Sequence, residues 1–304
     1  MSNDRKTPPA PDIPLAEPPF PNSELRTLNP APPPPYPERR TLNAERFYTP
    51  AELMVTIAAR EISNGDVVFV GMRLPLLAFI LAKLTHAPRA IGLFENGVIR
   101  EIPAADPVVT MGDPPNIFQA TMCCDMLTVM GFLQKGRVHI GFIGGAEVDK
   151  FGNLNTTQVE GPQGPVRLPG SGGGGDIASL ARKLLIIMAH EKRRFVEKVN
   201  YITSPGFGDG GNWRSRQGLV RGGPSAVITT LGVLRFDPTT REAYLSQVHP
   251  GIAPETVVEQ TGWELKTASE ISISPAPTLE ELAIIRCYDP QGFWTRSKTI
   301  PPTA

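Results

Sequence analysis

The sequence DVVFVGMRLPLLAFILAKLTHAPRAIGLFENG, residues 66–97, reads as a strand, a helix and a second strand. Residues 66–70 carry a continuous apolar run, which is typical of a strand covered on both faces of a sheet. A helix is expected at residues 74–84, and a second apolar run, residues 90–94, ends at Glu95. Two buried strands joined by a helix run parallel, because the helix returns the chain to the same end of the sheet. The stretch therefore predicts an α/β fold.

The same pattern recurs along the chain. Apolar runs that predict further strands lie at residues 139–143, 184–188, 201–202 and 226–230. Residues 231–236 and 243–248 flank a turn-forming Asp-Pro-Thr-Thr sequence and predict a hairpin. Because strands alternate with helices, the expected fold class is α/β: an open, mostly parallel, doubly wound sheet with helices on both faces.

Capping boxes mark the first and last expected helices. Thr49-Pro50-Ala51-Glu52 combines a capping box with proline at the first helical position, and Gly65 supplies a stop for the helix that begins there. Thr278-Leu279-Glu280-Glu281 opens a second helix, which is expected to reach about Arg286. These signals place the start of folded structure close to Thr49.

The N-terminal segment has a different composition. Of the 33 prolines, 14 lie in the first 50 residues. Proline fixes φ and has no amide donor, so this segment is not expected to form a helix or an interior strand. We therefore expect residues 1–46 to be a Pro-rich disordered arm, either solvated or lying over a partner subunit, and residues 47–304 to form the folded domain.

Composition and charge exclude several classes of protein. Lys+Arg and Asp+Glu both total 30, so the formal net charge is zero and favours neither a nucleic-acid partner nor a membrane surface. The apolar run at residues 74–84 is too short to cross a bilayer, and the N-terminus does not resemble a secretory signal. The three cysteines have no metal-binding spacing, which argues against a disulfide framework and a zinc site. A cytoplasmic location is expected.

Polar and glycine-rich segments follow the carboxyl ends of the expected strands. They are Gly71-Met72-Arg73, Glu95-Asn96-Gly97, Gly144-Gly145 and the run from Gly170 to Asp176. In open α/β sheets, ligands bind beyond the carboxyl ends of the strands. The clustering therefore predicts a ligand site at that edge.

Glu95 lies between an apolar strand and an Asn-Gly turn. A carboxylate in that place can be oriented and partly shielded from water, which would activate it as a nucleophile. The alternative is an ordinary acidic residue in a turn, and position alone does not decide between them.

The run Gly170-Ser171-Gly172-Gly173-Gly174-Gly175-Asp176 precedes an apolar helix. Consecutive glycines let backbone amides converge on an oxyanion, a phosphate or a thioester carbonyl. The run lacks the lysine of a P-loop, and its spacing does not fit a dinucleotide fingerprint. The alternative is a flexible linker.

Other polar groups give weaker signals. Glu147 and Asp149 could suggest a metal, but no further ligands lie at calcium-loop spacing, so a structured loop is expected and no metal site. The basic run in His190-Glu191-Lys192-Arg193-Arg194 could meet the phosphates of a ligand or a substrate carboxylate, or form a solvated or interface cluster. The four histidines are scattered and no serine or cysteine lies in a nucleophile elbow, so a hydrolytic triad has no support.

Several motifs, taken in order, resemble a known family. They are residues 142–146 with Asp149, residues 152–155, residues 170–173, residues 190–195 and residues 201–206. Together, over roughly residues 50–293, they resemble the β subunit of glutaconate CoA-transferase, a class I CoA-transferase. The resemblance implies an α/β fold of the CoA-transferase and ribose-isomerase superfamily. It also implies an α-subunit partner in a hetero-oligomer, with the active site where the two chains meet.

The same resemblance implies the roles of individual residues. Glu95 falls on the position of the catalytic glutamate. Gly172 and Gly173, with Gly144 and Gly145, fall on positions expected to face the thioester and CoA. Gly71, Asn96 and Ser204 are the substrate-pocket candidates. No permanently bound cofactor is implied, because coenzyme A is a substrate alongside an acyl-CoA and a free carboxylic acid.

Relatives on this scaffold keep other functions open. One branch hydrolyses a steroid-derived ring in a CoA thioester, and another decarboxylates methylglutaconyl-CoA. A glutamate at position 95 favours CoA transfer over both, although a carboxylate can also act as a general base. A non-catalytic partner subunit is the third alternative, and the intact glutamate and glycine run argue against it.

Overall fold

The computed structural model describes residues 48–219 and 221–296. The chain divides after Arg40, and every described residue belongs to the second unit, Thr41–Ala304. The predicted arm, residues 1–46, lies outside the described residues.

The described residues form helices and strands in alternation. The helices are α1 (Pro50–Arg60), α2 (Leu74–Leu84), α3 (Pro114–Ile117), α4 (Met126–Gln134), α5 (Gly174–Leu180), α6 (Trp213–Arg216), α7 (Pro254–Glu259) and α8 (Leu279–Tyr288). The strands are β1 (Val67–Phe69), β2 (Ile91–Leu93), β3 (Val98–Arg100), β4 (Met122–Cys123), β5 (Ile140–Ile143), β6 (Glu147–Val148), β7 (Leu154–Asn155), β8 (Gln158–Gly161), β9 (Gly164–Arg167), β10 (Lys183–Ile187), β11 (Pro224–Ile228), β12 (Gly232–Phe236), β13 (Ala243–Val248) and β14 (Lys266–Ile273).

Ten strands form one sheet in the order β14-β13-β12-β11-β10-β5-β1-β2-β3-β4. The five central strands, from β11 to β2, all run parallel. The pairs β11–β12, β12–β13, β2–β3 and β3–β4 are antiparallel. The predicted α/β class and the mostly parallel sheet are confirmed, and so is the hairpin, which is β12–β13.

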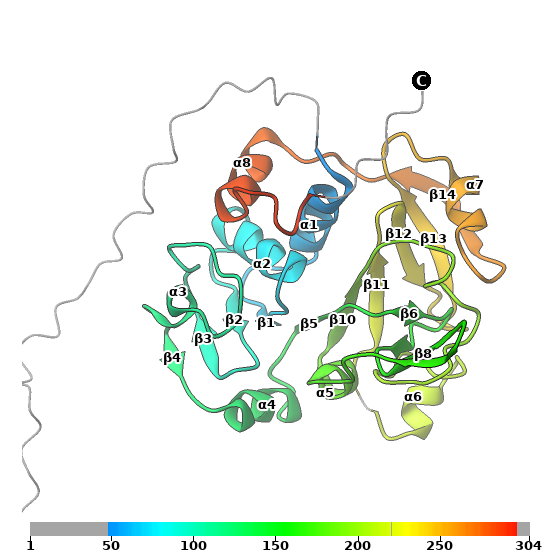
Figure 1. Cartoon of the computed structure of the whole chain (residues 1–304), viewed down its shortest axis with the longest axis horizontal. Coiled ribbons are helices and arrows are strands. Elements are labelled where there is room, and N and C mark those ends of the chain that lie inside the picture. The colour runs from blue at the N-terminus through cyan, green and yellow to red at the C-terminus, as the bar shows by residue number, and fades with distance from the viewer. Residues whose placement is uncertain (1–47, 220, 297–304) are drawn as a thin grey trace, which may run out of the picture. The chain divides into compact units, whose positions relative to one another are not determined.

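Helices cover both faces of this sheet (Figure 1). Side chains alternate between the faces along a strand, so Val68 and Val70 enter one apolar cluster and Phe69 enters the other. The first cluster includes residues of α1, α2 and α8. The second includes residues of α4 and α5. The sheet is therefore doubly wound, as predicted.

The predicted capping box of α1 is present. The Thr49 hydroxyl accepts a hydrogen bond from the Glu52 amide at 3.1 Å, and the Glu52 carboxylate accepts one from the Thr49 amide at 2.8 Å. The same carboxylate pairs with Arg286 of α8 at 2.7 Å. Glu52 is only 3% exposed and the Arg286 side chain is 38% exposed, so this ion pair joins α1 to α8 from a buried carboxylate to a partly solvated guanidinium.

Two details differ from the sequence expectations. Residues 201–202, expected as a strand, form none, and Tyr201 and Ile202 are exposed. The first helix ends at Arg60, because Glu61 already caps it, and Gly65 forms part of the turn that leads into β1.

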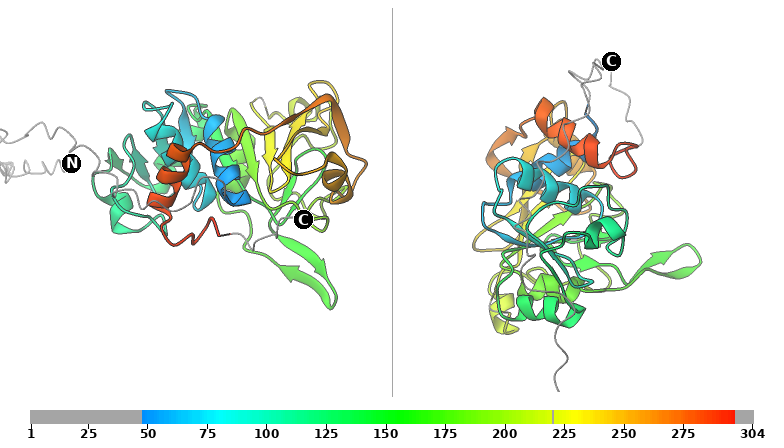
Figure 2. Two further views of the ribbon diagram at one scale, coloured as in Figure 1. Left: turned by 90° about the horizontal axis from the view of Figure 1, so that it is seen from above. Right: turned by 90° about the vertical axis from the view of Figure 1, so that its left-hand side faces the viewer.

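Strands β8 and β9 form a separate antiparallel hairpin. It stands away from the rest of the fold in both views of Figure 2. Its base is held by hydrogen bonds between Thr156 and Gly170, in which the Gly170 amide donates to the Thr156 carbonyl at 2.8 Å. The hairpin therefore leads directly into the glycine-rich run.

Candidate active site

Glu95 lies in the tight turn that joins β2 to β3. The Gly97 amide donates to the Phe94 carbonyl at 3.0 Å, and the Phe94 amide donates to the Val98 carbonyl at 2.8 Å. Gly97 has a φ of 99°, and a Cβ there would lie 1.9 Å from the carbonyl oxygen of Cys124. Only glycine fits at that position. The turn therefore holds Glu95 at the carboxyl end of β2.

The Glu95 carboxylate lies against the glycine-rich run. A Cβ placed on Gly173 would lie 3.2 Å from both Cδ and Oε2 of Glu95. Gly173 is buried and Glu95 is half-buried. Helix α5, which this run precedes, packs on β5 with Ile177 against Gly141. Residues 78 positions apart therefore meet at the edge of the sheet where the ligand site was predicted.

The glycine-rich run is a structured loop and not a flexible linker. The Thr156 hydroxyl donates to the Gly170 carbonyl at 2.7 Å, and the Gly174 amide donates to the Ser171 carbonyl at 2.8 Å. Within the described residues, the amides of Gly172 and Gly173 make no hydrogen bond. Two unengaged donors thus lie in the loop that contacts the carboxylate, which is the chemistry needed to bind a developing oxyanion.

The surroundings of this pair are partly apolar. Phe94 is 1% exposed, and the Cε atom of Met130, on α4, lies 2.7 Å from the position that a Cβ of Gly173 would occupy. Ser204 is 1% exposed, and its Oγ lies 2.8 Å from the Cβ position of Gly174. Ser204, expected in the substrate pocket, thus packs against the loop in this structure.

Asn96, the residue after Glu95, is exposed, but its side chain is engaged. Its Nδ2 donates to the Met111 carbonyl at 2.7 Å, and Nδ2 of Asn116 donates to the same carbonyl at 2.9 Å. The segment between β3 and β4 is held in turn by Arg100, which is 2% exposed. The Arg100 guanidinium donates to five backbone carbonyls, those of Ile102, Pro103, Pro115, Asn116 and Phe118. Asn96 therefore links the turn that carries Glu95 to a segment that Arg100 holds in place.

The other candidate glycines lie at neighbouring strand ends. Gly71 follows β1 and packs between Pro75 and the carbonyl of Phe142. Gly144 follows β5 beside the Ile187 carbonyl, and Gly145 packs against Leu154. All three lie at the carboxyl edge predicted for the site, and their proposed contacts with CoA or substrate stay predictions.

The segment expected to be a structured loop is ordered, with Glu147 in the short strand β6 and Asp149 directly after it. Glu147 accepts a hydrogen bond from Asn155 Nδ2 at 2.8 Å, and Asp149 accepts one from Asn153 Nδ2 at 2.9 Å. Burial raises the pKa of Asp149, although its hydrogen bonds with Asn153 act in the opposite direction. Among residues 48–219 and 221–296, no group of three or more His, Cys, Asp and Glu side chains is placed to hold a metal ion.

The histidine that opens the basic run is buried. His190 is 6% exposed and stacks on Phe195 with 3.8 Å between ring centroids. Its ring nitrogens hydrogen-bond to the hydroxyls of Thr229 and Thr261, each at 3.1 Å. Burial, and next the nearby His249, lowers the pKa of His190 to about 3. His190 is therefore neutral, while Lys192 and Arg193 are exposed.

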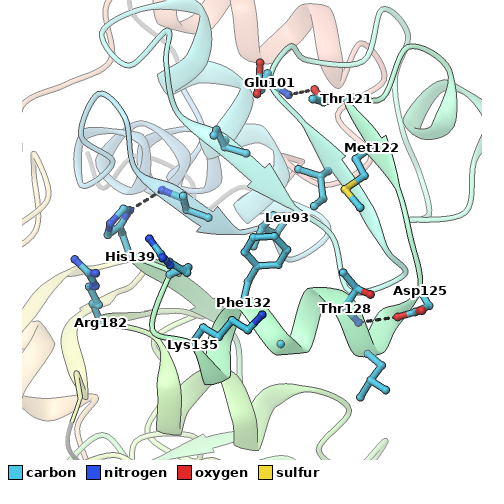
Figure 3. A pocket seen from close by; sticks show the side chains of 16 residues that line it. Leu93, Glu101, Thr121, Met122, Asp125, Thr128, Phe132, Lys135, His139 and Arg182 are labelled. Carbon is cyan, nitrogen blue, oxygen red and sulfur yellow. Dashed lines mark hydrogen bonds between the residues drawn. The ribbon is translucent and has the colours of Figure 1, made fainter.

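A groove of about 960 Å³ lies elsewhere, between α4 and the strands from β1 to β4. Its lining is mostly apolar, and Phe132 of α4 extends toward Leu93 of β2 (Figure 3). Lys135, His139 and Arg182 lie at one end, near the amino ends of the strands. Neither Glu95 nor the glycine loop lines this groove, so the groove and the candidate site are separate.

Sequence reasoning missed three features near the site. Met130 belongs to a helix that was not expected. The Met111 carbonyl accepts a hydrogen bond from Asn96, and this pairing could be found only from the folded structure. Arg73, exposed at the carboxyl edge after Gly71, has a φ of 69°, which is uncommon for a residue other than glycine. The positive φ has no signature in the sequence.

The fold and the site together define a class: an open α/β protein with a carboxylate and a glycine loop at the carboxyl edge of its parallel strands. The family model of coenzyme A transferase matches residues 52–260. The β subunit of 3-oxoadipate CoA-transferase from Pseudomonas knackmussii is 39% identical over 80% of this chain and 94% of its own length. The β subunit of glutaconate CoA-transferase from Acidaminococcus fermentans is 37% identical over 77% and 91%.

Solved structures show the same similarity. Glutaconate coenzyme A-transferase from Acidaminococcus fermentans superimposes with a TM-score of 0.76 and 34% identity, covering 82% of this chain and 98% of that chain. The decarboxylase AibA/AibB superimposes with a TM-score of 0.69 and 26% identity, covering 81% and 97%. This chain belongs to the coenzyme A transferase family, within which it is a β subunit of class I. No described helix is long and apolar enough to cross a membrane.

Proposed function

We propose that this chain, paired with an α-type companion chain, moves CoA from an acyl-CoA to a free carboxylic acid through a thioester on Glu95. The observation that carries the proposal is the contact between the Glu95 carboxylate and Gly173. The contact supports a role for Glu95 as the nucleophile, with backbone amides nearby that are suited to a tetrahedral oxyanion. Family membership supports the reaction class, and this geometry supports the proposed roles of the residues.

The proposed reaction conserves the thioester bond. The Glu95 carboxylate attacks the acyl-CoA carbonyl, which forms a mixed anhydride and releases CoA thiolate. The thiolate then attacks the glutamyl carbonyl, which forms the glutamyl-CoA thioester and releases the first acid. A second carboxylate repeats these steps in reverse, so the new acyl-CoA forms without ATP and Glu95 is regenerated.

The loop glycines act on the oxyanions of these steps. Each tetrahedral adduct carries a negative oxygen, and the free amides of Gly172 and Gly173 are its proposed donors. Loss of one such donor typically costs about 10²–10³-fold in rate. Gly144 and Gly145 are proposed to lie along CoA, and Gly71 and Asn96 to border the acyl group.

A companion chain is proposed because much apolar surface lies open next to the site. The exposed apolar side chains from the segment after β3 to the first turn of α4 include Ile117, Phe118, Met122, Met126 and Leu127. Cys124, within this segment, donates its amide to the Gly97 carbonyl of the Glu95 turn at 2.9 Å. Large exposed apolar patches usually mark protein interfaces. The two CoA-transferase relatives are each named as one subunit of an enzyme, which also supports a second chain.

The test is CoA exchange by the purified pair. The chain is coexpressed with the companion that copurifies with it, and exchange is followed by mass spectrometry between acetyl-, glutaconyl- and 3-oxoadipyl-CoA and the three free acids. We expect ping-pong exchange with at least one donor and acceptor, and a loss of about 10³-fold or more in the Glu95→Gln variant. Exchange that survives in this variant at the wild-type rate would overturn the proposal.

A further inference from the structure

Helix α4 places one methionine beside the reacting carboxylate. Val129 and Leu133 of this helix are fully buried and fix it on the sheet. The Asp125 side chain caps its start by accepting from the Thr128 amide at 2.6 Å. Met130, between the two buried residues, is half-buried and turns toward the glycine loop. Its position is thus set by the packing of the whole helix.

Met130 and Glu95 converge on a single point. The position that a Cβ of Gly173 would occupy lies 2.7 Å from Met130 Cε and 3.2 Å from Glu95 Cδ. Residue 173 has no side chain to separate these two groups, because it is glycine. The methyl group of Met130 therefore lies close to the carbon atom that would become the glutamyl thioester carbonyl.

We propose that Met130 keeps water away from the glutamyl-CoA thioester and so determines how often the enzyme transfers CoA rather than hydrolysing the intermediate. This inference rests on the proposed function. A thioether suits the role, since it is apolar and flexible enough to follow the carboxylate as it becomes an anhydride and then a thioester. Exclusion of water from reactive intermediates is a recognised task of an active site.

The side reaction that Met130 suppresses is a simple hydrolysis. Water adds its oxygen to the glutamyl carbonyl carbon, the carbon–sulfur bond breaks, one water proton passes to the CoA thiolate and the other passes to solvent. The products are the Glu95 carboxylate and free CoA, so one thioester is lost in each event. The measurable signature is CoA release that is not matched by new acyl-CoA.

The experiment measures the ratio of hydrolysis to transfer in the purified pair. Free thiol is followed with a thiol reagent and acyl-CoA exchange by mass spectrometry, in the same reaction and with the donor and acceptor that the wild type accepts. We expect Met130→Ala to raise the ratio about tenfold. Met130→Gln, which keeps the length of the side chain but is polar, should raise it as well, and Met130→Leu should stay close to wild type.

One further variant and a folding check keep the test decisive. Gln134→Ala removes an exposed side chain from the same helix and should leave the ratio unchanged. Copurification of the companion and the thermal midpoint report whether each variant is folded. An unchanged ratio in folded Met130→Ala and Met130→Gln overturns this inference alone. An absence of transfer in the wild type overturns the proposed function, and the inference with it.

Discussion

Glu95 and Gly173 derive their proposed roles from where the chain places them. Nothing in its residue type distinguishes Glu95 from the other acidic residues of the chain. Its turn, however, holds it at the end of a buried strand. Gly173 can approach it only because residue 173 lacks a side chain. Because Glu95 follows an apolar strand, the sequence alone made it a candidate nucleophile. The approach of Met130 to Gly173 and the hydrogen bond from Asn96 to the Met111 carbonyl were not predictable. Each joins two segments that are brought together only by the fold, and no sequence motif marks them.

Gly173→Ala tests the proposed contact at the residue scale. The new Cβ would lie 2.7 Å from Met130 Cε and 3.2 Å from Glu95 Cδ and Oε2, so the methionine must move and the carboxylate must shift by a few tenths of an ångström. A displacement of about 1 Å can cost about 10²-fold in rate, so we expect this smaller shift to lower kcat for CoA exchange by roughly several-fold.

Gly175→Ala is the matched control. A Cβ there would meet only the Thr203 carbonyl, at 3.6 Å, which is an ordinary contact. Alanine is the better helix former by about 1 kcal/mol, so this variant should be fully active and slightly more stable. Equal activities of the two variants would show that Gly173 does not need to be a glycine.

Secondary-structure elements were predictable where they are long and regular. The helices with capping boxes and the buried central strands follow directly from local patterns. The short element α4 has apolar residues all round, and β14 is an exposed edge strand, so neither shows a clear period. The buried hydrogen bonds of His190 also escaped prediction, because its partners Thr229 and Thr261 are distant from it in the sequence.

The burial of two histidines predicts how stability depends on pH. Burial lowers the pKa of both His190 and His249, and that of His190 reaches about 3. The unfolded chain therefore binds protons that the folded chain does not, and the free energy of unfolding falls as pH drops from about 6.5 toward 3. His190, which stays neutral in that window, contributes about 1.4 kcal/mol per pH unit, and the lowered pKa of His249 acts in the same direction.

His190→Gln isolates this effect from other titrating groups. The variant loses the stacking on Phe195 and should have a lower thermal midpoint than wild type at pH 7. It also lacks the ring that must stay neutral, so the difference from wild type should shrink as pH falls to 5. A difference that grows toward acid pH would contradict the assignment of a depressed pKa to His190.

At the scale of the whole molecule, the parallel core was predictable and the strand order was not. Alternating strands and helices indicate a doubly wound sheet. No local sequence pattern, however, predicts that β10 lies next to β5 or that antiparallel strands extend both edges of the sheet. That order brings the carboxyl ends of β2 and β5 to one edge, where Glu95 meets the loop before α5. The site is therefore a product of topology.

The boundary of the folded domain can be tested by truncation. The α1 cap is closed within residues 49–52, and the Thr49 hydroxyl donates to the Thr295 carbonyl at 2.7 Å. The start of the fold thus rests on contacts made from Tyr48 onward. We expect a chain lacking residues 1–45 to keep its thermal midpoint and CoA exchange in the pair. Insolubility or a large drop in the midpoint would contradict the predicted boundary.

The central claim is that CoA becomes attached to Glu95, and borohydride reduction of the intermediate tests it most directly. The purified pair is incubated with an acyl-CoA donor that it accepts, reduced with borohydride and digested, and the peptide that contains Glu95 is analysed by mass spectrometry. A glutamyl-CoA thioester should be reduced to the alcohol, which replaces one oxygen of the side chain by two hydrogens. The account predicts that change at Glu95, dependent on the donor and absent in Glu95→Gln. Reduction at another residue, with Glu95 unmodified, would contradict it.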